Sequence, residues 1–168
     1  AKSTTEEAAS EILAAEEQLL RNLLGDIVFG IDEETMETVV LERMRRQGMT
    51  LAVAETLTGG VMASRLSDID RQLEVFRGAT ITAGHDQGTG PERAIAAARK
   101  AQVDYSTDVG IAVVEAIASD GQRRGTVYLG IVMGNTEFTE LVALPGDRAR
   151  LRNYAVIGLM NYLRKLLS

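Results

Sequence analysis

The chain has 168 residues, of which 45% are hydrophobic and 25% charged, so it has the balance of a globular protein and is long enough for one domain with a substantial core. The formal charge of −6 and the scattered basic residues argue against nucleic acid as a partner, and the absence of cysteine excludes disulfides, thiolate zinc sites and a cysteine nucleophile. No apolar run approaches the roughly 20 residues that cross a bilayer, so we expect a cytosolic protein without membrane contact.

The first predicted element is an amphipathic helix in an acidic segment, which Gly25 should end. Its apolar stripe consists of Ile12, Leu19, Leu20, Leu23 and Leu24. A short extended piece, 26–30, should follow, and then a second helix that Asp32 caps with two glutamates in its first turn. The buried side of that helix should hold Met36, Val39, Val40 and Met44. We therefore expect residues 1–30 to form a helical arm or linker, and residues 31–168 to form the main domain.

The remaining chain alternates between strand and helix patterns. Short apolar or β-branched runs predict strands at 51–54, 75–82, 109–116, 126–133 and 136–144. Apolar spacing and alanine content predict helices at 61–69, 91–103 and 151–166. The turn Gly134-Asn135 is typical of a tight hairpin, so the last two strands should be antiparallel. This order predicts an α/β fold, a three-layer α/β/α sandwich with a mixed, mostly parallel sheet.

The most informative segment is Ala54-Glu55-Thr56-Leu57-Thr58-Gly59-Gly60, which leaves a buried strand and enters a helix. Ligands of open α/β sheets collect beyond the carboxyl ends of strands, and a helix start offers free N–H groups to a phosphate or carboxylate. An alternative is that Thr58 only caps the helix, while Gly59 and Gly60 allow close packing. Glu55 has two interpretations that the sequence leaves open, namely a bond to a ligand hydroxyl or the fixing of a backbone turn.

The same seven residues resemble the Ala-Glu-Ser-Cys-Thr-Gly-Gly signature of CinA C-terminal domains, and five of the seven agree. The resemblance continues, in the same order and spacing, at 75–78, 125–128 and 144–148, and 24–30 is similar to the segment before this domain in full-length family members. It implies a nicotinamide mononucleotide deamidase, which hydrolyses the carboxamide to give nicotinic acid mononucleotide and ammonia. It also implies that neither a metal nor another cofactor takes part.

The chain departs from the family at the residues that the resemblance makes catalytic. Thr56 replaces the nucleophilic serine, and the assisting tyrosine and lysine of the loop after the second strand become Ala83 and Gly88. A hydroxyl without a partner base is a poor nucleophile, because general-base help contributes roughly 10²–10⁴-fold in rate. His85 beside Asp86 is an alternative base, although a solvated loop histidine is the ordinary interpretation.

Two further departures concern the surroundings of the threonine. No lysine is within sequence reach of that loop; Lys100 on the following helix could fold back, but we do not expect it to act as the base. The family segment similar to Gly-Ile-Ala-Gly-Pro, after the third strand, appears here as 114–119 without its glycines and proline. The region before this segment is also shorter than in the family, which should reshape one wall of the pocket.

We therefore predict a degenerate CinA-like domain that keeps a cleft for a pyridine nucleotide or another small phosphate and associates as a homo-oligomer. Arg148 is near the substrate in the family, and its alternative roles are a first-turn arginine in solvent or a structural ion pair with Asp147 or Glu55. Arg77 is a second candidate for ligand binding, or only a charge at a strand edge. Two alternatives for the whole chain are an active nicotinamide mononucleotide deamidase that uses Thr56, and a structural oligomerisation module.

Overall fold

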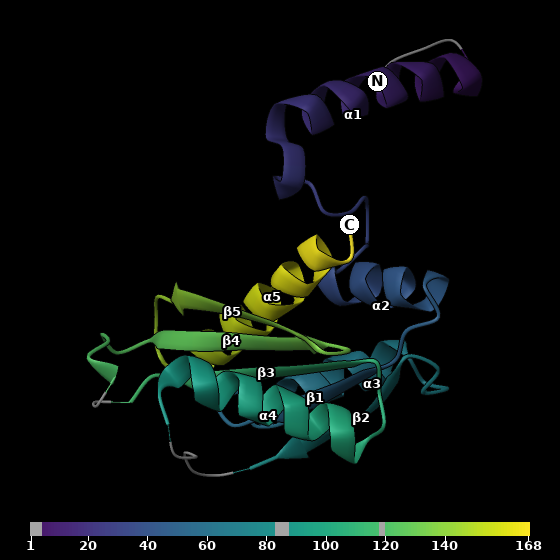
Figure 1. Ribbon diagram of the computed structural model, residues 1–168. Helices are drawn as coiled ribbons and strands as arrows, with labels where there is room; N and C mark the ends of the chain where they lie inside the picture. Colours follow the sequence, from purple (N-terminus) through teal and green to yellow (C-terminus); the bar gives the residue numbers. More distant parts are fainter. Residues whose placement is uncertain (1–4, 83–87, 118–119) are drawn as a thin grey trace. The chain divides into compact units, whose positions relative to one another are not determined.

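The computed structural model describes residues 5–82, 88–117 and 120–168, and Figure 1 shows the order of its elements. The helices are α1 (Glu6–Leu24), the 3₁₀ turn η1 (Gly25–Ile27), α2 (Met36–Arg46), α3 (Val61–Ile69), α4 (Gly90–Asp104) and α5 (Arg148–Leu166). The strands are β1 (Leu51–Glu55), β2 (Phe76–Ile81), β3 (Val109–Glu115), β4 (Thr126–Met133) and β5 (Thr136–Ala143). The chain divides into two compact units, 1–35 and 36–168.

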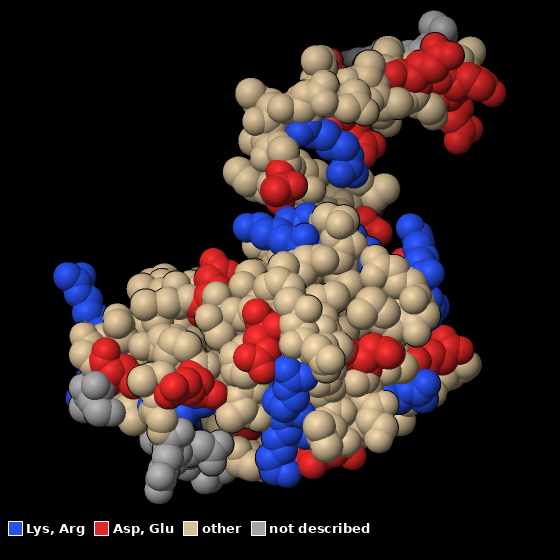
Figure 2. All heavy atoms as spheres, viewed as in Figure 1, with Lys and Arg blue, Asp and Glu red and all other residues tan. Residues whose placement is uncertain are grey.

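Helix α1 is the predicted amphipathic helix, and none of its residues is buried. The Thr5 hydroxyl accepts the Ala8 N–H at its start, and Gly25 ends it with a φ of +55°, as expected. The predicted apolar stripe is exposed to solvent, and Leu23 at 81% is its most exposed member. In the view of Figure 2, acidic side chains gather at the N-terminal end of α1. This unit leaves an amphipathic helix with its apolar face uncovered.

The segment between α1 and α2 differs from the prediction. A 3₁₀ turn takes up the first part of the predicted extended piece, and Asp32 does not cap α2, which begins four residues later at Met36. The physical reason is a local turn: the Ile31 N–H donates to the Glu34 carboxylate at 2.8 Å, and the Glu34 N–H donates to the Ile31 carbonyl at 3.0 Å. The predicted buried side of α2, namely Met36, Val39, Val40 and Met44, is confirmed.

The sheet has the strand order β2-β1-β3-β4-β5 and is mixed, as predicted. Strand β1 is parallel to both β2 and β3, whereas β3–β4 and β4–β5 are antiparallel. Parallel and antiparallel pairings are therefore equal in number, so the sheet is less parallel than predicted. The reason lies in the link from β3 to β4, residues 116–125, because a parallel partner requires a crossover of a dozen residues or more.

Helices cover both faces of the sheet, which confirms the three-layer arrangement (Figure 1). Helix α4 lies on one face so closely that a Cβ on Gly110 would be 2.0 Å from the Ala98 carbonyl oxygen. The same holds at Gly130, where a Cβ would be 2.4 Å from the Ala94 carbonyl oxygen. Helix α5, with α2 and α3 beside it, covers the opposite face. The two glycines therefore set the distance between α4 and the sheet.

Tyrosines tie the covering helices to the two edge strands. The Tyr105 hydroxyl, just after α4, donates to the Ala79 carbonyl of β2 at 2.8 Å. The Tyr162 hydroxyl of α5 donates to the Thr139 carbonyl of β5 at 3.3 Å. These bonds occupy one carbonyl of each edge strand. Within the described ranges, no helix is long and apolar enough to span a lipid bilayer.

Candidate functional site

The candidate site lies where the strand ends meet. The parallel strands β1, β2 and β3 all have their carboxyl ends at one edge of the sheet, and the antiparallel pairing brings the start of β4 and the end of β5 to the same edge. The loop after β1, the link after β3 and the start of α5 therefore meet there, which is the usual position of ligand sites in α/β sheets.

Glu55, the last residue of β1, is completely buried and holds the start of α3. Its Oε2 accepts the N–H of Gly60 at 2.8 Å and that of Met62 at 3.2 Å, and its Oε1 accepts the Ala63 N–H at 2.8 Å. A carboxylate at a helix start is favoured by the unpaired N–H groups and the helix dipole. Of its two open interpretations, the structure therefore shows the fixing of the backbone, and the chain's own carboxylate occupies the N–H groups considered for an external anion.

Thr56 follows Glu55, and its hydroxyl donates to the Val113 carbonyl oxygen of β3 at 2.9 Å. The single hydroxyl proton is thereby directed at a backbone oxygen, which cannot remove it. Lys100 lies on α4, where its ammonium bonds the Asp104 carboxylate at 2.6 Å, one helical turn away. Ala83, His85 and Asp86 lie outside the described residues. Within the part that the structure describes, the Thr56 hydroxyl forms no hydrogen bond to a basic side chain.

Thr58, Gly59 and Gly60 form the turn into α3. Both glycines have a positive φ, +60° and +96°, which explains why the turn needs glycine. Thr58 does not cap the helix, because Gly60 occupies the N-cap position. The Thr58 Oγ1 atom is buried and has no hydrogen-bond partner among the described residues.

Arg152 of α5 lies over this turn, and our sequence analysis did not identify it. Its Nε donates to the Leu57 carbonyl at 3.0 Å, and its guanidinium would be 3.6 Å from a Cβ on Gly59. A signal was present in the sequence, because Arg148 and Arg152 are four residues apart in a helix and share one face.

Arg148 is the first residue of α5, and its side chain is 66% exposed. Its guanidinium lies 3.7 Å from the carboxylate of Glu115, at the end of β3. The alternative pairing with Asp147 or Glu55 is wrong: Asp147 accepts the Arg150 N–H at 2.9 Å, and Glu55 is buried beneath α3.

A cavity of about 300 Å³ lies beside Arg148 at this edge of the sheet. It is lined by Glu115, Arg124, Gly125, Gly146, Asp147, Arg148 and Leu151. Arg77 is exposed on β2 and is not among these residues, so the structure does not bring the two predicted arginines together in this cavity.

A buried ion pair supports the link after β3. Arg93 of α4 is 1% exposed, and its Nη2 lies 2.7 Å from Asp120 Oδ2. The hydrogen bond from Arg93 lowers the pKa of the Asp120 carboxyl, since burial alone would raise it. Arg93 also donates to the carbonyls of Gly88 at 3.1 Å and Glu115 at 3.4 Å. One side chain thus joins the start of α4 to the link that closes the site, although nothing in the sequence marked either residue.

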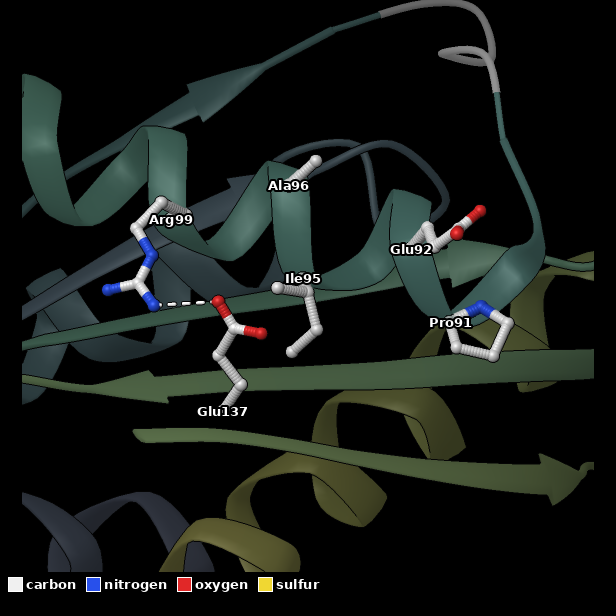
Figure 3. A pocket seen from close by; sticks show the side chains of 6 residues that line it. All are labelled: Pro91, Glu92, Ile95, Ala96, Arg99 and Glu137. Atoms are coloured by element: carbon white, nitrogen blue, oxygen red, sulfur yellow. Dashed lines mark hydrogen bonds and ion pairs between the residues drawn. The ribbon is translucent and has the colours of Figure 1, made fainter. Parts of the chain in front are cut away.

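A second cavity of about 400 Å³ lies between α4 and β5, away from every predicted site residue (Figure 3). It is lined by Pro91, Glu92, Ile95, Ala96, Arg99 and Glu137. Figure 3 shows Arg99 turned toward Glu137, to which it donates at 2.7 Å. Arg99 and Glu137 thus form an ion pair with each other at one end of this cavity. In the described ranges, no three His, Cys, Asp or Glu side chains are arranged to hold a metal ion.

Comparisons with known proteins agree on one family. The model of the CinA C-terminal domain matches residues 33–87. A CinA-like protein of Frankia casuarinae is 30% identical over 179 residues, which cover 95% of this chain and 41% of that protein. A CinA-like protein of Kosmotoga olearia is 26% identical over 187 residues, which cover 99% of this chain and 45% of that protein. The chain therefore spans less than half the length of these two relatives.

Solved structures of this family share the fold. The competence/damage inducible protein CihA from Agrobacterium tumefaciens superposes with a TM-score of 0.71 at 20% identity, covering 84% of this chain and 99% of that one. A competence or damage-inducible protein from Enterobacter asburiae gives a TM-score of 0.71 at 18% identity, covering 81% and 100%. At these identities the likeness establishes the fold alone.

Proposed function

We propose that the chain, which belongs with the CinA C-terminal domain proteins in sequence and fold, is a cytosolic member that binds a small phosphate ligand and hydrolyses amides poorly if at all. The proposed ligand is a pyridine nucleotide or a related small phosphate, bound beside Thr56 and Arg148. The resemblance supplies the ligand class, and the chain's own residues supply the reason for impaired hydrolysis.

The observation that carries the proposal is the bond from the Thr56 hydroxyl to the Val113 carbonyl. A nucleophilic hydroxyl must transfer its proton to a base as it attacks, and a peptide oxygen is far too weakly basic to accept it. The threonine methyl also restricts the side-chain rotamer. Loss of general-base help alone is expected to lower the rate by about 10²–10⁴-fold.

The direct test is the release of ammonia from nicotinamide mononucleotide by the purified chain. We expect no more ammonia from the wild type than from Thr56→Val, which keeps the shape of the side chain but removes the hydroxyl. Ammonia release by the wild type that disappears in Thr56→Val would show an active deamidase and overturn the proposed impairment.

The binding part of the proposal is tested separately by thermal unfolding with nicotinamide mononucleotide. A ligand at 100 times its Kd stabilises the folded state by about 2.7 kcal/mol, which raises the melting temperature by several degrees. We expect this rise in the wild type and its loss in Arg148→Ala. Unfolding curves that do not respond to the nucleotide, with Arg148→Ala changing only the stability, would favour a purely structural module.

The proposal includes self-association of the chain, for which the exposed apolar stripe of α1 is the support. Sedimentation equilibrium should show masses above the monomer that fall to the monomer in Leu23→Lys. Asn22→Lys places the same charge on a polar position of the same helix and should leave the mass unchanged. A wild type that stays monomeric at all concentrations would contradict this part.

A further inference from the structure

Arg124 is the second guanidinium of the cavity that contains Arg148. It lies just before β4 in the link after β3, its side chain is exposed, and it forms no hydrogen bond or ion pair with the residues that the structure describes. Arg124 belongs to no recognised motif, so nothing in the sequence marks it. Two arginines from separate elements thus line one cavity of about 300 Å³.

Among the described residues, the only ion pair of these two arginines is the long one between Arg148 and Glu115. Arg148 lies 3.7 Å from Glu115, beyond hydrogen-bond distance, and exposed ion pairs of this kind contribute little. The other acidic residue, Asp147, uses its carboxylate to cap α5 through the Arg150 N–H. Both guanidinium groups therefore keep N–H donors for a ligand.

The charge of the surrounding unit does not oppose an anion. Residues 36–168 carry 16 Lys and Arg against 15 Asp and Glu, for a net charge of +1. The first 35 residues carry 2 basic and 9 acidic residues, so the acidity of the chain comes from there. Helix α5 also begins at the cavity, and its dipole adds a partial positive charge.

The two arginines favour a phosphate over a carboxylate as the ligand. A carboxylate has one negative charge and two oxygens, so it can satisfy the two guanidinium groups only in part. A phosphate monoester carries close to two negative charges near pH 7 and three oxygens, which can engage both arginines at once. Arginine forks bind such groups in a bidentate manner.

We propose that Arg124 and Arg148 together clamp the phosphate dianion of a phosphate monoester, a role that rests on the proposed function and deepens it. The clamp lies beside the threonine along β3: the Thr56 hydroxyl bonds Val113, and Glu115 of the cavity wall is two residues further along the same strand. A ligand whose phosphate is held there has its remaining part at the same edge of the sheet as Thr56.

Isothermal calorimetry can isolate the phosphate by comparing nicotinamide mononucleotide with nicotinamide riboside, which lacks it. We expect Arg124→Ala to weaken binding of the mononucleotide by about tenfold or more, because a charge-assisted bidentate contact is lost. Binding of the riboside should not change. Arg123→Ala is the matched control, since Arg123 is exposed and adjacent but does not line the cavity; it should alter the affinity less than about twofold.

Inorganic phosphate separates failure of this inference from failure of the proposed function. If the mononucleotide does not bind but phosphate does, and Arg124→Ala abolishes that binding, the clamp stands and the proposed pyridine ligand is wrong. If Arg148→Ala weakens binding of the mononucleotide while Arg124→Ala behaves like Arg123→Ala, the clamp is refuted and the proposed function survives. If wild type binds neither compound, both are refuted.

The pH dependence gives a second readout. The second pKa of a phosphate monoester is about 6, so its affinity should fall between pH 7.5 and pH 5.5 as the dianion is protonated. Sulfate keeps its two charges over this range and should bind equally well at both pH values. A phosphate affinity that does not change between these pH values would contradict recognition of the dianion.

Discussion

Glu55→Gln tests whether the buried carboxylate holds the start of α3. The change keeps the size of the side chain, removes its charge and turns one acceptor oxygen into an NH₂ donor. Because the two oxygens of Glu55 together accept three backbone N–H groups, the glutamine must leave at least one of these N–H groups facing another donor at a buried or half-buried position.

The size of the effect follows from these contacts. An unsatisfied buried N–H costs about 1–3 kcal/mol, and loss of a negative charge at a helix start costs about 0.5–2 kcal/mol in a buried position. We therefore expect a loss of about 2–4 kcal/mol in the free energy of unfolding. For a chain of this size that corresponds to a fall of about 5–15 °C in the melting temperature.

Urea unfolding, followed by circular dichroism, measures this free energy. Glu92→Gln is the control, because Glu92 also accepts a backbone N–H at a helix start, that of Thr89 at 2.9 Å, but is exposed to solvent. It should lower the free energy of unfolding much less than Glu55→Gln does, because water can replace the lost acceptor. If Glu55→Gln stays within about 0.5 kcal/mol of the wild type, the carboxylate does not hold the helix and the reasoning fails.

Two further changes test the packing around the site. Asp120→Ala leaves the buried Arg93 guanidinium without its carboxylate partner, so we expect a loss of about 3–5 kcal/mol in urea unfolding at pH 7. Since the folded pKa of Asp120 is lowered, its contribution is complete above about pH 4 and fades as the pH falls below that value, so the difference between wild type and variant should shrink toward pH 3. Equal differences at both pH values would contradict this assignment. Gly130→Ala should cost about 1–3 kcal/mol, because its Cβ would meet the Ala94 carbonyl of α4, and an unchanged melting temperature would show that α4 can shift freely.

Most secondary structure could be predicted from the sequence because its signals are local. All five strands and the helices from α2 onward lie close to the predicted ranges, since alternation, β-branched residues and helical spacing act over a few neighbours. The error at the start of α2 also arises because the prediction uses only local signals. Around Asp32 the reciprocal bonds of Ile31 and Glu34 compete with capping, and no residue pattern shows which of the two wins.

The site was predicted only in part. The segment from Glu55 to Gly60 was correctly placed between a strand and a helix, but its sequence left the role of Glu55 open. Arg152 could have been found from its spacing to Arg148 along the helix. Arg124 and Arg93 could not, because their positions relative to the strand ends depend on how β4 returns beside β3.

By itself, the sequence determined the α/β architecture, the family likeness and the replacement of serine by Thr56, since each depends on residue identity and on short-range spacing. Only the tertiary structure decided which atoms the Thr56 hydroxyl and the Arg148 guanidinium contact. The Thr56 proton is directed to Val113, 57 residues away, and Arg148 lies beside Glu115 and not beside Asp147 or Glu55. Such pairings join strands and helices that are distant in the chain, and they are set by the order and direction of the strands, which local propensity does not encode.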